Sequence, residues 1–156
     1  MSDRLALVDI DGLVADTRHR DAYAINRDWG TYFSMAGDDG LWQEGFDLVE
    51  KLEMIGYDIA WLTGRREDMR PLTEKWLRKK GFPDFPLIMR KMEDRTKLAL
   101  LKAGVIFDAS LLYPDGVLMY DDDPWVIEEA DNVLPGSGRH CTWYVKPASV
   151  VRRAVA

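Results

Sequence analysis

The chain has 156 residues, of which 47% are hydrophobic and 31% are charged. This length fits one folded domain, and this composition excludes a disordered chain. The 27 acidic and 21 basic residues give a formal net charge of -6. That balance argues against a general nucleic-acid-binding protein, because such proteins present a basic surface to phosphates.

Cysteine, histidine and membrane signals exclude further classes of protein. The single cysteine, Cys141, excludes an internal disulfide and a cysteine-rich zinc site, and two histidines are too few for a histidine-based metal cluster. No apolar run approaches the roughly 20 residues that a membrane-spanning helix needs, and the first residues lead into a strand and not a signal peptide. We therefore expect a cytoplasmic protein that makes no membrane contact.

Short apolar runs alternate with amphipathic segments along the chain. The apolar runs predict strands at residues 5–8, 59–62, 87–89, 117–120 and 142–145. The amphipathic segments predict helices that end near residues 55, 80, 104 and 130, with Asp68, Asp94 and Asp123 as N-caps of the last three. This alternation predicts an α/β fold, a Rossmann-like three-layer sandwich with a mainly parallel sheet of about five strands, within a single domain over residues 1–156.

Residues 12–44 interrupt this alternation, because they separate the first strand from its helix by far more than the usual connection of about 2–6 residues. The segment is too apolar for a solvated loop. We expect it to fold as a small cap or lid. Its large apolar side chains are Tyr23, Trp29, Tyr32, Phe33, Met35 and Trp42.

Acidic and hydroxyl side chains gather where the predicted strands end, at residues 9–12, 63–65 and 121–123. In open parallel sheets ligands bind beyond the carboxyl ends of the strands, so these side chains are expected to converge. Several carboxylates so close together repel one another unless a cation neutralises them, and all-oxygen ligands suit a hard cation such as Mg²⁺. Asp123, which precedes a proline, is more readily explained as a helix N-cap than as a ligand.

The spacing of Asp9 and Asp11 allows them different tasks at one substrate, because side chains two residues apart in an extended segment project to the same side. One carboxylate can attack phosphorus while the other transfers a proton. Gly12 lets the backbone turn away without a side chain that would block the phosphate.

Together these motifs resemble the haloacid dehalogenase (HAD) superfamily of phosphohydrolases. The match consists of Asp9-Ile10-Asp11-Gly12, Thr63 after an apolar strand, a lysine at a helix start, and Asp121-Asp122. More narrowly, three segments are similar to the phosphatase domains of phage polynucleotide kinases, and a fourth, Arg27-Asp28-Trp29 followed by Tyr32-Phe33, is similar to their short cap. The three segments are Leu62-Thr63-Gly64-Arg65, Arg70-x-x-Thr73-x-x-Trp76-Leu77 and Leu87-Ile88-Met89-Arg90.

The resemblance, which covers residues 5–130, implies a role for each motif. Asp9 would attack phosphorus and become an aspartyl phosphate, Asp11 would transfer protons, and Thr63 would donate its hydroxyl to the phosphoryl oxygens. Mg²⁺ would be held by Asp9, the main-chain carbonyl of Asp11, and Asp121 or Asp122. Position 13 departs from the family pattern, since it is leucine where threonine or valine is usual; we expect this to be tolerated.

Two lysines compete for the lysine of the family pattern. Lys97 is predicted in the first turn after Asp94, near the positive helix end where a phosphate would bind. Lys102 has the spacing to Asp121 that is closer to the polynucleotide-kinase pattern, but a helix over 94–104 would place it near the helix C-terminus. We therefore predict Lys97 as the catalytic lysine.

Four further residues are candidates for substrate binding. Gly64 and Arg65 follow the catalytic strand, where an arginine is well placed to meet phosphate, and His19 and Arg20 follow the first motif. A surface role explains Arg65, His19 and Arg20 equally well. Two interpretations also remain open for Trp29, Tyr32 and Phe33 of the cap: they can stack on a nucleobase, or they can form the core of the cap.

The resemblance implies a Mg²⁺-dependent phosphomonoesterase that acts on a nucleotide or on a 3′-phosphorylated polynucleotide end. The acidic charge balance argues against binding of extended duplex. The sequence has no P-loop, so kinase activity is not expected. A small-metabolite phosphatase of the same superfamily is the first alternative. A phosphate-receiver signalling domain is less favoured, because its phosphorylated aspartate would end the third strand, which here ends in Met89-Arg90.

Overall fold

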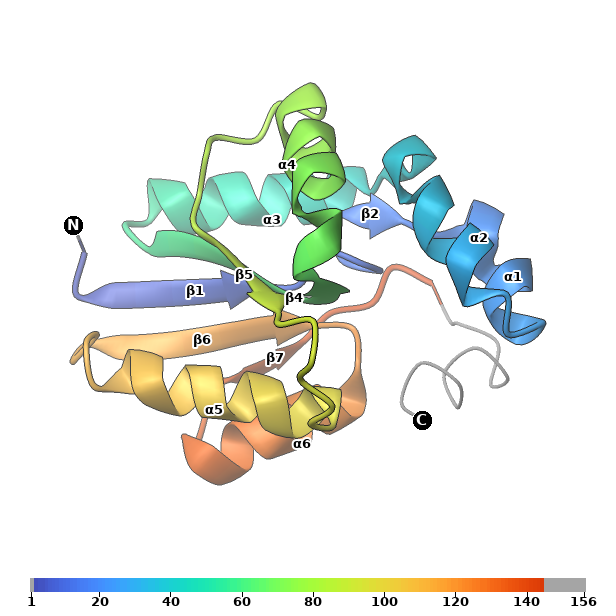
Figure 1. The fold of residues 1–156 in the computed structure, drawn as a ribbon. Coiled ribbons are helices and arrows are strands. Elements are labelled where there is room, and N and C mark those ends of the chain that lie inside the picture. Colours follow the sequence, from blue (N-terminus) through green and yellow to red (C-terminus); the bar gives the residue numbers. More distant parts are fainter. Residues whose placement is uncertain (1, 145–156) are drawn as a thin grey trace.

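The computed structural model describes residues 2–144, in which five parallel strands form one sheet (Figure 1). The strand order is β5-β4-β1-β6-β7, with β1 at the centre. This arrangement confirms the predicted α/β fold. The strands are β1 (Arg4–Val8), β4 (Asp58–Arg66), β5 (Leu87–Arg90), β6 (Gly116–Asp121) and β7 (Gly138–His140).

Helices cover both faces of the sheet (Figure 1). On one face lie α3 (Gln43–Met54) and α4 (Arg70–Lys79), and on the other lie α5 (Leu98–Ser110) and α6 (Pro124–Val133). Alternate residues of β1 enter the two cores: Ala6 and Val8 pack in the α3/α4 core, whereas Leu5 and Leu7 pack in the α5/α6 core. A strand buried on both faces needs apolar residues at every position, which explains the uninterrupted runs in the sequence.

A small cap is inserted between β1 and α3, as predicted. Its base is closed by the antiparallel pair β2 and β3, and its helices α1 and α2 lie beyond the end of the sheet toward which β1 and β6 point (Figure 1). The cap therefore lies over the carboxyl ends of the central strands. Its elements are β2 (Ala15–Asp16), η1 (Arg18–Arg20), α1 (Asp21–Ile25), α2 (Trp29–Ser34), η2 (Met35–Asp38) and β3 (Gly40–Leu41).

The predicted N-caps of two helices are wrong and one is confirmed. The Asp123 carboxylate accepts from the backbone N–H of Trp125 at 2.9 Å and caps α6. Asp94 instead accepts from the backbone N–H of Thr96 at 2.9 Å, which makes a local turn, so α5 begins only at Leu98 and continues beyond residue 104. A short 3-10 turn, η3 (Glu67–Met69), precedes α4 and includes Asp68.

The predicted strand over residues 142–145 is also wrong for the part that the structure describes; residue 145 lies outside the described residues. The fifth strand is β7, whose residues pair with β6 from Met119↔Gly138 to Asp121↔His140. The apolar signal at 142–144 has another cause. Trp143 packs against the α3/α4 core, and its indole N–H donates to the carbonyl of Leu13 at 2.7 Å.

Within residues 2–144, none of the helices has the length and apolar character needed to cross a bilayer.

Gly45, in the first turn of α3, fixes the loop after β1 by close backbone contact. A Cβ at this position would overlap the carbonyl oxygen of Leu13. Leu13 is itself fully buried in the α3/α4 core, which explains why a leucine is accepted there. The loop that carries Asp9 and Asp11 is thus packed directly onto α3.

We expect Gly45→Ala to lower the free energy of unfolding by about 2 kcal/mol, because the backbone of the loop cannot give way as a side chain would. Gly104→Ala on α5 is the control: a Cβ there meets nothing within 4 Å, and alanine should stabilise the helix by about 0.5–1 kcal/mol. Urea denaturation of both variants measures the difference, and equal effects would contradict the close contact.

Candidate active site

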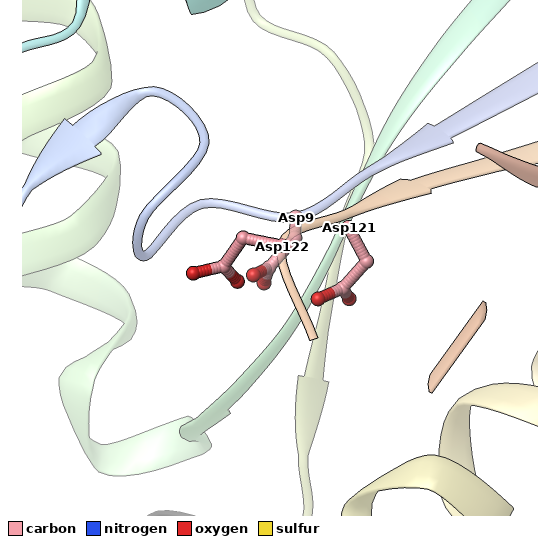
Figure 2. Close-up of side chains that lie close together, drawn as sticks. All are labelled: Asp9, Asp121 and Asp122. Atoms are coloured by element: carbon pink, nitrogen blue, oxygen red, sulfur yellow. The ribbon is translucent and has the colours of Figure 1, made fainter. Parts of the chain in front are cut away.

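Three carboxylates from the ends of two adjacent strands share one space (Figure 2). Asp9 directly follows β1, Asp121 is the last residue of β6, and Asp122 comes next. Each offers an oxygen that lies within 4.8 Å of the others. Asp9 and Asp121 are 6% and 1% exposed and are shielded from water, whereas Asp122 is half-buried. The structure thus brings together three of the acidic residues that the sequence placed at strand ends.

Lys102 forms ion pairs with two members of the cluster. Its ammonium lies 3.0 Å from Asp9 Oδ1 and 2.6 Å from Asp121 Oδ2, and the side chain is 1% exposed. Because α5 begins at Leu98, Lys102 is near the N-terminus of the helix and reaches the strand ends. Lys97, which the sequence analysis favoured, is exposed just before the helix and makes no ion pair with the described residues. Lys97 thus lies at the N-cap of α5 and not in its first turn as predicted, and the contact with the acidic cluster is made by Lys102.

One lysine only partly offsets the charge of the cluster. Burial, together with the neighbouring charge of Asp121, raises the pKa of Asp9 to about 7, although Lys102 opposes the shift. Burial likewise raises the pKa of Asp121 to about 6, against the effect of Lys102. For Lys102, burial would lower the pKa, but the two carboxylates outweigh it and raise the pKa above its usual value. The ionised form of both acids is therefore favoured by a further positive charge in this space.

The donor set fits a hard divalent cation. All three side chains offer carboxylate oxygens, they lie within reach of a common ion, and no sulfur ligand is part of the cluster. Oxygen ligands of this kind suit Mg²⁺, which binds through one or two carboxylates plus waters and substrate phosphate.

Asp11 lies in a different electrostatic environment, although only one residue separates it from Asp9. Arg20 Nη2 donates to Asp11 Oδ1 at 2.8 Å, and Arg65 donates to both oxygens, at 2.6 Å from Nη2 and 3.2 Å from Nε. Both guanidinium groups are buried, whereas the Asp11 side chain is 25% exposed. The two arginines therefore fix the orientation of a carboxylate that remains accessible from outside.

Asp39 completes this network and was missed by the sequence analysis. Its carboxylate, which is 1% exposed, accepts two hydrogen bonds from Arg20 at 2.8 Å each and one from Arg65 at 3.2 Å, and lies 2.7 Å from His19 Nε2. Its carbonyl accepts from the indole N–H of Trp76 at 2.8 Å. Two arginines and two aspartates thus form a neutral, mostly buried quartet. The sequence signal was weak, because the acidic pair Asp38-Asp39 lies in an insertion that also contains Asp16, Asp21 and Asp28.

The candidate substrate ligands Arg20 and Arg65 therefore contact Asp11 and Asp39 directly, and His19 contacts Asp39. Arg20 is fully buried, which excludes the solvated-loop alternative for this residue. Arg65 also donates to the Thr73 hydroxyl at 3.1 Å. Each arginine side chain is thus held in place by the quartet before any substrate arrives.

Thr63 and Gly64 lie inside β4, which extends to Arg66, four residues beyond the predicted strand end. The Thr63 hydroxyl is buried and accepts from the backbone N–H of Arg65 at 3.1 Å. At Gly64 a Cβ would come within 2.9 Å of the Leu98 side chain. The absence of a side chain at Gly64 therefore leaves room for the Leu98 side chain at the start of α5.

Comparison with known proteins identifies the family. A family model described as the polynucleotide kinase PNKP phosphatase domain matches residues 3–128. The chain belongs to this family. It is therefore a phosphatase of the HAD superfamily, which confirms the resemblance seen in the sequence motifs. A search of the curated proteins found no match.

Solved structures share the fold of this PNKP-type phosphatase chain at low sequence identity. A chain of the Pnkp1/Rnl/Hen1 RNA repair complex matches with a TM-score of 0.71 and 23% identity, over 88% of this chain and 42% of that chain. A class C acid phosphatase from Bacillus anthracis matches at 0.63 and 14%, over 88% and 65%. A haloacid dehalogenase-like hydrolase from Streptococcus pneumoniae matches at 0.64 and 14%, over 99% and 92%. The chain spans less than half of the RNA repair protein that it matches.

We expect Lys102→Met to reduce phosphate release by at least about 100-fold, because a buried charge aimed at the reacting group contributes on this scale. Lys97→Met is the matched control and should stay within about twofold of the wild type, since Lys97 is exposed. Phosphate release by both variants, with urea denaturation as a check of folding, tests the assignment. Loss of activity in the Lys97 variant alone would reverse it.

The Asp39 carboxylate is expected to control the orientation of Asp11 through the two arginines. In Asp39→Asn the buried guanidinium groups lose one of their two carboxylate partners, which should lower the unfolding free energy by about 3 kcal/mol. We also expect kcat to fall more than KM rises. Asp38→Asn, a change at the exposed neighbour, is the control for both measurements. An equal effect of the two variants on kcat would show that Asp39 does not position Asp11.

Proposed function

We propose that this protein is a Mg²⁺-dependent phosphomonoesterase that removes phosphate from a nucleotide or a 3′-phosphorylated polynucleotide end through an aspartyl phosphate. One observation carries the mechanism: Asp9 and Asp11 lie two positions apart but belong to two separate charge networks. Asp9 pairs with Lys102 beside Asp121, whereas Asp11 is held by two arginines. Two carboxyl groups in different environments are suited to different roles, one as nucleophile and the other as acid and base.

In the first step the Asp9 carboxylate attacks phosphorus, and the bond from phosphorus to the leaving oxygen breaks. Asp11, which is ionised in the quartet, takes up a proton with the incoming substrate and donates it to that oxygen, so the product leaves as an alcohol and Asp9 carries the phosphoryl group. In the second step Asp11 takes a proton from water, whose oxygen attacks the phosphorus of the aspartyl phosphate. Inorganic phosphate leaves, and Asp9 is regenerated as a carboxylate.

Charge neutralisation supports both steps. Asp9, Asp121 and Asp122 would hold the Mg²⁺, together with the main-chain carbonyl of Asp11, and the ion would offset the negative charge of the transferring phosphoryl group. Lys102 supplies a fixed positive charge between Asp9 and Asp121. The site therefore neutralises a phosphate among carboxylates that would otherwise repel it.

Thr63 and Gly64 are proposed to hold the phosphoryl oxygens. The oxygen of the Thr63 hydroxyl already accepts the N–H of Arg65, so its hydrogen can be donated to a phosphoryl oxygen. The start of α5, which lies against Gly64, adds the positive end of a helix dipole. In this proposal Lys102 takes the catalytic role for which the sequence analysis favoured Lys97.

Family membership supports the choice of substrate class, because the matching model describes phosphatase domains of polynucleotide kinases. A structural relative belongs to an RNA repair complex. The net charge of -6 favours a mononucleotide or a short polynucleotide end over an extended duplex.

We expect phosphate release from a 3′-phosphorylated oligonucleotide to require Mg²⁺ and to fall at least about 1000-fold in Asp9→Asn, since an amide cannot form the acyl phosphate. Asp115→Asn, at an exposed position before β6 at the opposite edge of the sheet, should leave the rate unchanged. Phosphate release with and without EDTA measures both effects. Undiminished activity of the Asp9 variant would reject the proposed nucleophile.

The same assay with a 5′-mononucleotide and a sugar phosphate tests the substrate class. Faster release from the two nucleotide substrates is the expected result. Equal turnover of all three compounds would reject the nucleotide assignment and favour a small-metabolite phosphatase.

A further inference from the structure

Helix α2 of the cap is rich in aromatic residues although it lies at the surface. It spans only Trp29–Ser34, and none of its residues is buried, although three of them are aromatic. Phe33 is 37% exposed. Aromatic residues that form the core of a small cap would be expected to be buried, so the core explanation left open by the sequence does not account for this helix.

The three rings form one cluster. Tyr32 meets Trp29 edge-on, with ring centroids 5.6 Å apart, and meets Phe33 edge-on at 5.2 Å. Trp29 and Phe33 lie 6.2 Å apart with an angle of 28° between their planes. We call Trp29, Tyr32 and Phe33 the aromatic cluster. Its members hold one another in fixed orientations, so little side-chain entropy is lost when a ligand binds to them.

A single guanidinium group connects the aromatic cluster to Asp11. The Arg20 Cζ atom lies 4.3 Å from the centre of the Tyr32 ring, and Arg20 Nη1 donates to the Tyr32 carbonyl at 3.4 Å. The same side chain donates to Asp11 at 2.8 Å. The cluster is therefore continuous with the network that orients Asp11.

This continuity bears on the leaving group. Under the proposed function Asp11 protonates the leaving oxygen, so the first atoms of the leaving group must lie beside Asp11. In an in-line displacement the leaving group departs on the side of phosphorus opposite Asp9, and therefore away from the acidic cluster to which Asp9 belongs. The leaving group thus extends from Asp11 toward the cap.

We propose that the aromatic cluster binds the nucleobase of the leaving nucleoside by stacking, chiefly on Trp29 and Phe33, since Tyr32 already faces Arg20. This inference rests on the proposed function and adds the part of the substrate that the cap recognises. Every nucleobase has a flat π face, so stacking accepts any base at the phosphorylated end. It also supplies affinity that does not depend on basic side chains, which suits an acidic chain.

The test compares a nucleoside 3′-monophosphate with the corresponding ribose phosphate that lacks a base. We expect Trp29→Ala and Phe33→Ala each to raise KM for the nucleotide by about 5- to 100-fold, the range for loss of one stacking contact, with little change in kcat. KM for the base-free compound should not change. Phe33→Leu, which keeps an apolar side chain but no ring, should behave like Phe33→Ala.

Phe107→Ala is the matched control, because Phe107 is an exposed aromatic residue on α5, 52% exposed and outside the cap. It should leave both KM values unchanged. An unchanged KM for the nucleotide in the cap variants, or an equal rise for both compounds, would overturn base stacking while leaving the phosphatase proposal intact. Failure of the wild-type protein to release phosphate from these two compounds and from the 3′-phosphorylated oligonucleotide would instead reject the proposed function.

Discussion

The ion pairs of Lys102 with Asp9 and Asp121 are the interaction on which the site depends. Parallel strands place their carboxyl ends side by side, and here two adjacent strands end in buried carboxylates that repel each other. Lys102, in the second turn of α5, reaches between them. The architecture thus supplies both a concentration of negative charge and part of the positive charge that makes it tolerable.

A second network separates the roles of two acids that lie close together in the chain. Asp11 turns toward Arg20 and Arg65, and Asp39 balances the charge of these arginines from within the cap. The quartet carries no net charge, so its burial does not leave a charge unpaired. Because one of the two carboxylates comes from the cap, the cap takes part in shaping the site and does not only cover it.

Sequence reasoning worked where the physical cause was local or periodic. Continuous apolar runs marked four of the five strands, and Asp123 before a proline marked the start of α6. It failed where the outcome depended on competing partners. Asp94 was expected to cap a helix that ends at Gly104, but its carboxylate bonds to Thr96 in a turn and α5 runs from Leu98 to Ser110. Lys102, expected near the C-terminus of that helix, is therefore near its N-terminus, and this is why the sequence analysis preferred Lys97.

Other features depend on contacts between distant segments and leave little trace in the sequence. Asp39 meets Arg65 across 26 positions, and no spacing rule connects a cap residue to a strand end. The strand β7 is short and polar, with the sequence Gly-Arg-His, whereas the apolar residues that follow it pack on the α3/α4 core as irregular chain. Tertiary packing determines both features, so periodicity could not identify them.

The indole of Trp76, on α4, holds the backbone of Asp39 from the body of the molecule. Swinging the cap outward would break this bond and would also separate Arg20 from Asp11 and Arg65 from Asp39. Because such a movement would cost these interactions, we expect the cap to keep a fixed position on the body of the molecule. Substrate selectivity in such a phosphatase comes from a preformed surface. The substrates it accepts are those whose shape fits between the cap and the strand ends.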